Sequence, residues 1–270
     1  MRVLPDFIII GGQRCGTTSL YNYLIRHPQI TPGYRKEVHF FDFNFNKGIY
    51  WYRSYFPTRI IKYFYEKLLH RKLFTGEASP YYFFHPLTPK RIYETIPKVK
   101  LILLLRNPVD RAYSHYHHEV RRGRENLSFK DAIDKEKERL KGEKEKILDD
   151  NNYDSNNYKR FAYLSRGKYA EQIIDWYKYF PEEQLLIIKS EDFYENPQKQ
   201  LNNIHAFLGL KEWSLKEFKK YNFAKDKYTG MDEVLKERLN EYFRPFNRKL
   251  YSLLKRDFGW DAGRNNNEQL

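Results

Sequence analysis

The stretch Phe7-Ile8-Ile9-Ile10-Gly11-Gly12-Gln13-Arg14-Cys15-Gly16-Thr17-Thr18-Ser19-Leu20 decides the fold. Its first four residues are apolar and rich in β-branched side chains, which predicts a short buried strand. Glycines then bound a turn, and residues 19–25 are expected to begin a helix. A strand, a glycine loop and a helix N-terminus together form a cradle for anions, because free backbone N–H groups and the helix dipole point at the ligand.

The side chains of this loop also favour an anionic ligand. Thr17, Thr18 and Ser19 supply hydroxyl donors, and Arg14 supplies a full positive charge. The loop is not a Walker A sequence, because no G-x-x-x-x-G-K-[ST] can be written here. A tight turn without a ligand is the alternative, but four cationic or hydroxyl side chains on one loop favour phosphate binding.

The composition is that of a basic globular protein. The chain has 270 residues, and 49 Lys and Arg against 35 Asp and Glu give it a net charge of +14. This length suits one domain with a substantial core, and we expect that domain over residues 1–264 with a frayed tail at 265–270. The charge favours an anionic partner, which could be a nucleic acid, a phosphorylated cofactor, an acidic glycan or a membrane surface.

Cys15 is the only cysteine, which excludes an intrachain disulfide and a cysteine-based zinc site. A helix N-terminus lowers the pKa of a thiol and can make it reactive, but a small side chain that suits a tight loop is the simpler interpretation. No signal peptide is recognisable, and no apolar run has the length of a membrane span. We therefore expect a cytoplasmic protein without a membrane span.

Predicted strands alternate with predicted helices along the chain. Strands are expected at 7–10, 73–82 (running into a loop), 100–105 and 184–189, and helices at 19–25, 50–57, 89–96, from 108 onward, 169–177, 201–208 and twice between 231 and 255. This order predicts an α/β fold with a central, mainly parallel sheet. Ligands bind at the carboxyl ends of strands in such sheets, so the loops after Ile10, from Gly76 and from Arg106 should share one edge.

Two other segments lead to more limited expectations. Residues 36–42 are expected to be extended, which would project Glu37 and His39 from the same side. Residues 128–150 are dense in Lys and Glu, which is typical of a solvated helix with ion pairs.

A second anion-binding pattern follows the strand at 100–105. Arg106 comes directly after the strand, and Ser114 lies eight residues further on, with Arg111 between them. A guanidinium binds phosphate through two parallel hydrogen bonds, and a hydroxyl completes the site. Taken alone, Arg106 would be better explained by a surface salt bridge. Together with the first loop it indicates a ligand with two separated anionic groups, such as a nucleotide with a 5′ and a 3′ phosphate.

These two patterns resemble the donor-binding motifs of sulfotransferases that use 3′-phosphoadenylyl sulfate (PAPS). The matching segments are 12–20 and 105–114, and the resemblance extends along most of the chain. It is nearest to the heparan sulfate (carbohydrate) sulfotransferase branch, to which segments 36–42, 242–250 and 258–260 are similar. The resemblance implies a P-loop-like three-layer sandwich, with the parallel sheet flanked by helices.

The resemblance also implies roles for particular residues. The first loop would hold the 5′-phosphosulfate, Arg106 and Ser114 the 3′-phosphate, and a looser match suggests a basic loop closing over the donor. The donor-binding residues expected on this basis are Gln13, Arg14, Cys15, Gly16, Thr17, Thr18, Ser19, Arg106, Ser114, Lys225, Lys227 and Tyr228. The residues expected to contact the acceptor are Lys36, Phe40, Glu77, Ser79 and Tyr81.

Glu37 is the implied base that takes the acceptor proton, and His39 would orient or assist it. A base needs a pKa near neutrality, and we expect Phe40, Phe41 and nearby tyrosines to raise the pKa of Glu37. Without the resemblance, a surface carboxylate paired with Lys36 or Arg35 would be the better interpretation.

The chain departs from the family pattern at three places. Arg14 replaces the usual lysine of the first loop and cannot deliver a proton, so its expected catalytic role is electrostatic stabilisation alone. Ala78 stands where the heparan branch has a lysine, and that branch's late cysteine pair is absent. These differences leave the donor interpretation intact and weaken the case for a heparan-like acceptor.

The implied reaction is in-line transfer of a sulfuryl group from PAPS to a hydroxyl or amine, leaving adenosine 3′,5′-bisphosphate (PAP). The expected acceptor is a saccharide, with no nucleic-acid partner. No metal is expected, and His115, His117 and His118 are interpreted as helix-surface residues. A small metabolite is the alternative acceptor. A P-loop nucleotide kinase and a basic module binding glycans or nucleic acid are the alternative functions.

Overall fold

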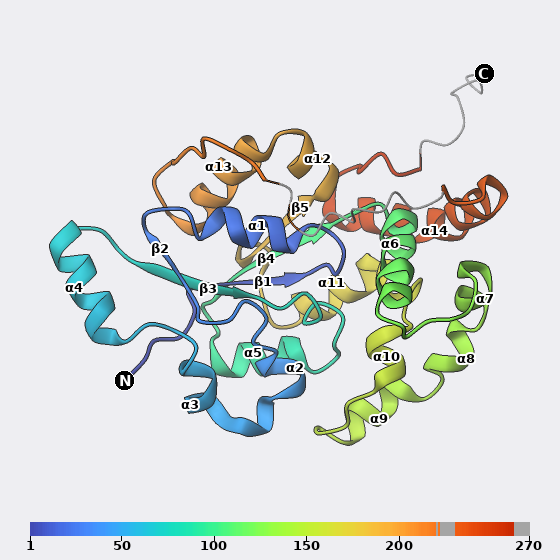
Figure 1. Ribbon diagram of the computed structural model, residues 1–270, viewed down its shortest axis with the longest axis horizontal. Helices are drawn as coiled ribbons and strands as arrows, with labels where there is room; N and C mark the ends of the chain where they lie inside the picture. Colours follow the sequence, from blue (N-terminus) through green and yellow to red (C-terminus); the bar gives the residue numbers. More distant parts are fainter. Residues whose placement is uncertain (220, 222–229, 262–270) are drawn as a thin grey trace.

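Five strands form the central sheet, in the order β2-β3-β1-β4-β5 (Figure 1). The strands are β1 (Phe7–Gly11), β2 (Ile30–Pro32), β3 (Phe74–Ala78), β4 (Lys100–Leu105) and β5 (Leu185–Lys189). In the computed structural model, which describes residues 1–219, 221 and 230–261, all four strand pairings are parallel. The predicted α/β class and parallel sheet are therefore confirmed.

Helices cover both faces of the sheet (Figure 1). On one face, α1 (Thr17–Leu24), α12 (Ser190–Glu195) and α13 (Pro197–Leu208) pack on Phe7 and Ile9 of β1. On the other, α2 (Phe40–Phe43), α3 (Gly48–Arg53), α5 (Thr88–Thr95) and α11 (Tyr169–Tyr177) pack on Ile8 and Ile10. Successive β1 side chains thus enter two different cores, which gives the three-layer arrangement.

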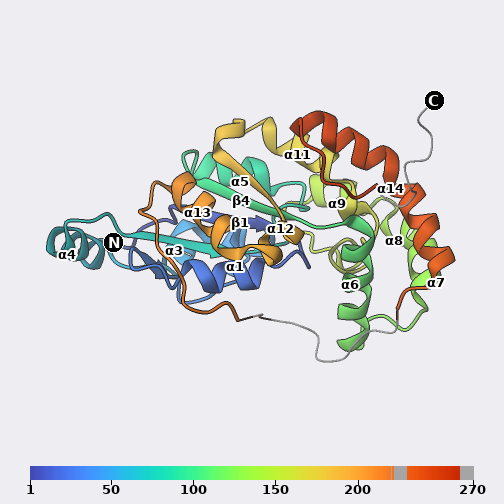
Figure 2. The same cartoon turned by 90° about the horizontal axis from the view of Figure 1, so that it is seen from above.

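A further group of helices lies beyond the carboxyl ends of the strands (Figures 1 and 2). It contains α6 (Pro108–Arg121), α7 (Phe129–Asp134), α8 (Glu136–Leu140), α9 (Glu143–Asp149), α10 (Asn156–Arg160) and the long α14 (Glu233–Leu254). A separate apolar cluster that includes Ala112, Ile133 and Phe243 holds α6, α7 and α14 together.

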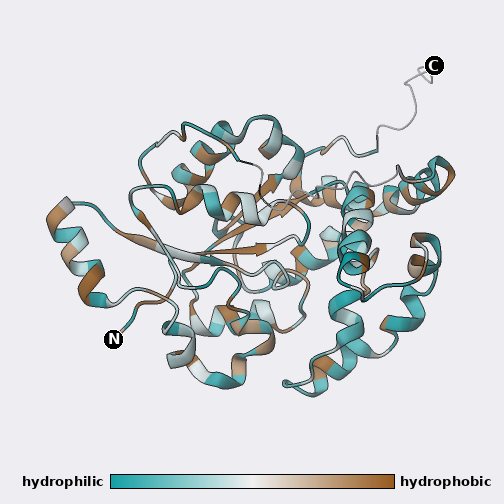
Figure 3. Ribbon diagram, viewed as in Figure 1, coloured by the Kyte–Doolittle hydropathy of each residue, from teal (hydrophilic) through white to brown (hydrophobic). Residues whose placement is uncertain are grey.

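The Lys/Glu-rich segment 128–150 differs from its prediction. It forms three short helices, α7 to α9, instead of one solvated helix. Phe129, Ile133 and Ile147 are buried, and Gly142 breaks the helix between α8 and α9 with a φ of 75°. The segment is strongly hydrophilic (Figure 3), and its few apolar residues still decide which sides face the protein.

The remaining elements complete the frame. They are α4 (Arg59–Leu69) and the 3-10 turns η1 (Phe45–Lys47), η2 (Ser165–Gly167) and η3 (Glu182–Gln184). The sequence did not predict β2, α4 or α12. It predicted two helices between 231 and 255, where one 22-residue helix, α14, contains Pro245.

Candidate active site

The loop between β1 and α1 is held at the carboxyl edge of the sheet by contacts from neighbouring segments. The Gly12 N–H donates to the carbonyl oxygen of Leu104 at 2.7 Å, which ties the loop to β4. Ser190 donates to the Cys15 carbonyl oxygen at 2.8 Å. Gly16 precedes α1 with a φ of 96°, and a Cβ there would lie 2.8 Å from the Tyr194 hydroxyl, so both conformation and space require glycine.

The predicted donor residues of this loop differ in accessibility. Thr17 and Ser19 are buried, and the Ser19 hydroxyl accepts a hydrogen bond from the Tyr221 N–H at 3.3 Å. Thr18 is partly exposed. The side-chain oxygen of Gln13 accepts a hydrogen bond from the buried Arg166.

Cys15 is a buried thiol. Burial raises its pKa to about 11, against the opposing charges of Arg111 and Arg106. The thiol is therefore neutral at physiological pH, which agrees with a packing role and not with a reactive nucleophile.

The second predicted motif meets the first. Arg14 donates from Nε to the Ser114 hydroxyl at 3.1 Å, although the two residues are 100 positions apart. Asn107 caps α6 by accepting hydrogen bonds from the N–H groups of Val109 and Asp110 at 2.9 and 3.4 Å, which fixes the turn that follows Arg106. The neighbouring positions of β1 and β4 in the sheet bring the two motifs together.

The segment after β2 brings four charged residues to the first loop. Lys36 donates from its ammonium to the Thr18 hydroxyl at 2.8 Å and to Glu37 Oε1 at 2.7 Å. His39 lies between two carboxylates, with Nε2 3.6 Å from Glu37 Oε2 and Nδ1 2.7 Å from Asp42 Oδ2. The Asp42 side chain is fully buried, whereas that of Glu37 is 44% exposed. Glu37 is thus the carboxylate of this group that a ligand can reach.

The electrostatics of Glu37 differ from the prediction. Burial alone would raise its pKa, but the hydrogen bonds and charges of His39 and Lys36 outweigh burial and lower the pKa to about 2. The expectation that aromatic neighbours raise this pKa is therefore wrong. His39 shifts the other way, because its bonds to Asp42 and Glu37 outweigh burial and raise its pKa to about 10.

Segment 36–42 is not the extended strand that its alternation predicted. His39 has a φ of 53°, in the left-handed region, and α2 begins at the next residue. Glu37 and His39 still lie close to each other, with His39 Nε2 3.6 Å from Glu37 Oε2, but they meet across a turn and not on one face of a strand.

A buried network beneath this segment is centred on Glu77. Its Oε1 accepts from the hydroxyls of Tyr52 and Tyr82 at 2.7 and 3.1 Å, and its Oε2 accepts from Ser79 at 2.7 Å. Burial raises the pKa of Glu77 to about 7, against these hydrogen bonds.

The same network satisfies the backbone of segment 36–42. The N–H of Val38 donates to Glu77, that of His39 to Ser79 and that of Phe40 to the Tyr82 hydroxyl, at 3.4, 3.2 and 2.8 Å. Glu77 and Ser79 have no exposed surface, so they cannot contact an acceptor as predicted, and they position the segment instead.

The other predicted acceptor residues are also mostly internal. Phe40 is buried and stacks on Tyr52 with ring centroids 4.6 Å apart. Tyr81 is buried and stacks on Phe43 at 5.1 Å. Of the five residues predicted to contact the acceptor, Lys36 is the one beside Glu37 with an accessible side chain. Lys225, Lys227 and Tyr228 lie outside the described residues.

Sequence reasoning missed two residues of the site. Asp42 was quoted only as part of a segment, although its spacing of three from His39 places it within reach in a helical turn. Arg166 is buried and reaches both Gln13 and the ring of Tyr81. Its partners are distant in sequence, and no local pattern identifies it.

One of the three histidines of α6 differs from its interpretation. His115 is fully buried, with its ring packed against Tyr163, so it is not a surface residue. Within residues 1–219, 221 and 230–261, no group of three His, Cys, Asp or Glu side chains is arranged to hold a metal ion.

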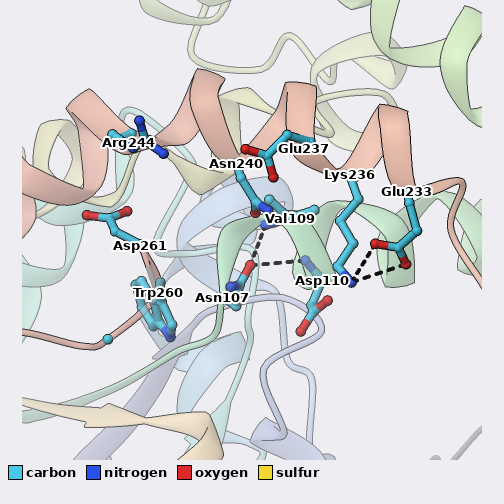
Figure 4. Close-up of a pocket in the computed structure, with 11 residues that line it drawn as sticks. Asn107, Val109, Asp110, Glu233, Lys236, Glu237, Asn240, Arg244, Trp260 and Asp261 are labelled. Atoms are coloured by element: carbon cyan, nitrogen blue, oxygen red, sulfur yellow. Dashed lines mark hydrogen bonds and ion pairs between the residues drawn. The ribbon is translucent and has the colours of Figure 1, made fainter. Parts of the chain in front are cut away.

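A pocket of about 450 Å³ opens between the start of α6 and α14 (Figure 4). Four acidic residues line it, Asp110, Glu233, Glu237 and Asp261, against two bases. One of those bases, Lys236, pairs with Glu233 at 3.3 Å. This lining opposes an anionic ligand, so the pocket does not extend the predicted anion-binding loop.

The model of the sulfotransferase domain family matches residues 4–252. The chain belongs to this family. The sulfotransferase shares 34% identity with the sulfotransferase from Alicyclobacillus acidocaldarius, whose crystal structure superimposes with a TM-score of 0.69 over 96% of this chain and 99% of that one. The predicted P-loop-like three-layer fold is therefore confirmed.

Two curated relatives extend the comparison. The sulfotransferase is 30% identical to the membrane-associated sulfotransferase kil1 of Dictyostelium discoideum, over 95% of this chain and 66% of that protein. It is 29% identical to the heparan sulfate glucosamine 3-O-sulfotransferase 3B1 of Mus musculus, over 96% of this chain and 65% of that protein. The predicted likeness to carbohydrate sulfotransferases is confirmed, and the chain spans just under two thirds of each of these relatives.

The same comparison corrects the predicted localisation. A cytoplasmic protein was expected, but the relatives include a membrane-associated sulfotransferase and heparan sulfate sulfotransferases, so that expectation is wrong. Among the helices that the structure describes, none has both the length and the apolar character needed to cross a bilayer.

Proposed function

We propose that this sulfotransferase transfers a sulfuryl group from PAPS to a hydroxyl or amine of a saccharide. The observation that carries the proposal is the position of the Lys36 ammonium, which hydrogen-bonds both Thr18 in the first loop and the Glu37 carboxylate. The link places the only accessible carboxylate of the Glu37–His39–Asp42 group within two hydrogen bonds of the start of α1.

The donor would lie across the two joined motifs. Backbone N–H groups at the start of α1 and the Arg14 guanidinium supply positive charge for the 5′-phosphosulfate. Arg106 and Ser114 supply a guanidinium and a hydroxyl for the 3′-phosphate. The bond between Arg14 and Ser114 supports a single ligand site built from both motifs.

Glu37 would act as the base. The acceptor oxygen or nitrogen attacks sulfur, the bond from sulfur to the 5′-phosphate oxygen breaks, and the acceptor proton passes to Glu37. The low pKa keeps Glu37 ionised but makes it a weak base while Lys36 and His39 contact it. We infer that the donor sulfate draws the Lys36 ammonium away, which raises the pKa of Glu37 when the proton has to be taken.

A saccharide acceptor is supported by two observations. A relative that matches 96% of the chain is named for heparan sulfate glucosamine. The net charge of +14 also favours an acidic glycan over a neutral small molecule.

Transfer of labelled sulfate from PAPS tests the proposal. The panel contains heparan-type chains, other acidic glycans and small hydroxylated compounds, and we expect label in the glycans. Label confined to small compounds would contradict the saccharide acceptor while leaving the donor in place.

Binding of PAP tests the donor site separately. Loss of a charge-assisted contact in Arg106→Ala should weaken PAP binding by about 10- to 100-fold. Arg248→Ala, which removes an exposed guanidinium of α14, serves as the matched control. Unchanged PAP affinity in Arg106→Ala would remove Arg106 from the donor site.

A further inference from the structure

Helix α4 projects from the protein at the end of the sheet opposite the active site. In Figures 1 and 2 it extends beyond β2 and β3, away from the helices that cover the sheet. Thr58 begins it by accepting a hydrogen bond from the Ile61 N–H at 3.2 Å. The helix ends at Leu69, five residues before β3 begins at Phe74. The other end of β3, its carboxyl end, lies beside the segment that carries Glu37, and this side of the sheet is the Glu37 edge.

One side of α4 is anchored to the protein. The Lys62 ammonium pairs with Asp6 at 3.2 Å, and the Tyr65 hydroxyl donates to the Pro28 carbonyl oxygen. Glu66 accepts a hydrogen bond from the Leu73 N–H at 3.2 Å. These residues recur every three or four positions and therefore define the inward side of the helix.

The opposite side carries an exposed apolar stripe. Ile60, Phe64 and Leu68 follow one another at intervals of four and are 66%, 63% and 79% exposed. Ile61 and Tyr63 flank the stripe and are also more than half exposed. Apolar residues on α4 are visible in Figure 3. Five large apolar side chains on three turns of helix form a contiguous patch, which is unusual for a surface with no partner.

The patch is bordered by bases. Arg59, Lys67, Arg71 and Lys72 are exposed on α4 or directly after it. The only acidic residue between 59 and 72 is Glu66, which lies on the inward side. An apolar stripe bordered by cations, with no outward acid, matches the surface of an anionic bilayer, which offers acyl chains beneath negative headgroups.

We propose that α4 docks the protein on an anionic membrane surface, with Ile60, Phe64 and Leu68 at the headgroup–acyl boundary. Arg59, Lys67 and Arg71 then lie among the lipid headgroups. A second copy of the chain fits less well as the partner. The bases on its α4 would lie against the same bases on this α4 and repel them. Since the Glu37 edge is at the other end of the sheet, docking through α4 leaves the active site open to solution.

Co-sedimentation with lipid vesicles tests this docking. The full chain is expected to bind vesicles of phosphatidylcholine mixed with phosphatidylserine, and to bind pure phosphatidylcholine and high-salt samples weakly. The double variant Phe64→Glu/Leu68→Glu should lose at least about tenfold in vesicle binding, because it places two charges in the acyl region. Lys67→Glu/Arg71→Glu should lose the preference for phosphatidylserine.

The matched control adds the same two charges elsewhere. Leu148 on α9 and Val234 on α14 are exposed, so Leu148→Glu/Val234→Glu should bind vesicles like the parent protein. All variants should keep PAP binding, which reports folding independently of lipid. Equal vesicle binding by the α4 and control variants would overturn the proposal. So would a dimer in sedimentation velocity that the Phe64→Glu/Leu68→Glu variant dissociates, because it would assign the patch to a second copy.

Discussion

His39 lies between two carboxylates of the candidate site, with one ring nitrogen facing Glu37 and the other facing Asp42. Burial would favour the neutral ring, but the bonds to Asp42 and Glu37 raise its pKa to about 10. Since the folded pKa exceeds the ordinary value of 6.5, the stabilisation from this charge is complete below about pH 6.5 and is lost as the pH rises through about 10.

We expect nuclear magnetic resonance to find His39 as an imidazolium at about pH 8, where an ordinary histidine is neutral. Asp42→Asn should lower its pKa by more than about one unit, because the nearer carboxylate is removed. Titration of His39 near 6.5 in the parent protein would contradict this electrostatic account.

A second effect of a single residue is that of Lys36, which lowers the pKa of Glu37. Removing the ammonium in Lys36→Met should raise the pKa of Glu37 from about 2, so the acid limb of the kcat/KM profile should move to higher pH. Lys90→Met, which removes an exposed lysine of α5, is the control and should leave the profile in place. If the acid limb of Lys36→Met stays at the pH of the parent protein, Lys36 does not control the pKa of Glu37.

At the scale of elements, segment 36–42, which carries the proposed base Glu37, depends on side chains of a different strand and loop. Tyr82 accepts the Phe40 N–H and donates to Glu77, so it joins the segment to β3. Tyr82→Phe leaves the buried Phe40 N–H without that acceptor, which should cost about 1–3 kcal/mol in the free energy of unfolding measured with urea.

The same variant should lower kcat more than it raises KM, because it displaces Glu37 without removing a donor contact. Tyr93→Phe, which removes the hydroxyl of an exposed tyrosine on α5, is the control for both measurements. Stability and kcat equal to those of the parent would show that the network does not hold the segment.

The elements that the sequence predicted best are those with one consistent pattern of apolar residues along their whole length. β4 is a continuous apolar run and is buried at five of its six positions, so its sequence could indicate only a covered strand. β2 has three residues in a turn-rich stretch, and α4 turns its apolar stripe outward, so neither follows the usual pattern of burial. The split of 128–150 into three helices depends on packing against α6 and α10, which local composition does not encode.

For the site as well, local sequence motifs were predictable and contacts between distant segments were not. Arg14, Glu37, Arg106 and Ser114 of the proposed site could be named from the sequence because each belongs to a motif that is continuous in sequence. The low pKa of Glu37 could not be predicted, because it depends on how the fold turns His39 and Lys36 toward that carboxylate. The buried positions of Glu77 and Ser79 could not be predicted either, because they arise from the packing of β3 and the loop after it against the segment after β2.

At the scale of the whole molecule, the order of the sheet assembles the proposed site. β1 lies between β3 and β4, so three loops from separate parts of the chain meet at one edge. Arg14 contacts Ser114 across the β1–β4 boundary, and Lys36 joins the first loop to Glu37 on the β3 side. The central claim is that this edge holds the donor and presents its sulfate to Glu37.

Comparing Glu37→Gln with the parent protein in two assays tests that claim most directly. PAP affinity should stay within about twofold, while sulfuryl transfer from PAPS should fall by about 100- to 10,000-fold, as expected for loss of a general base. Glu94→Gln, at an exposed carboxylate of α5, should change neither quantity. Full transfer activity in Glu37→Gln, with PAP binding intact, would contradict the account.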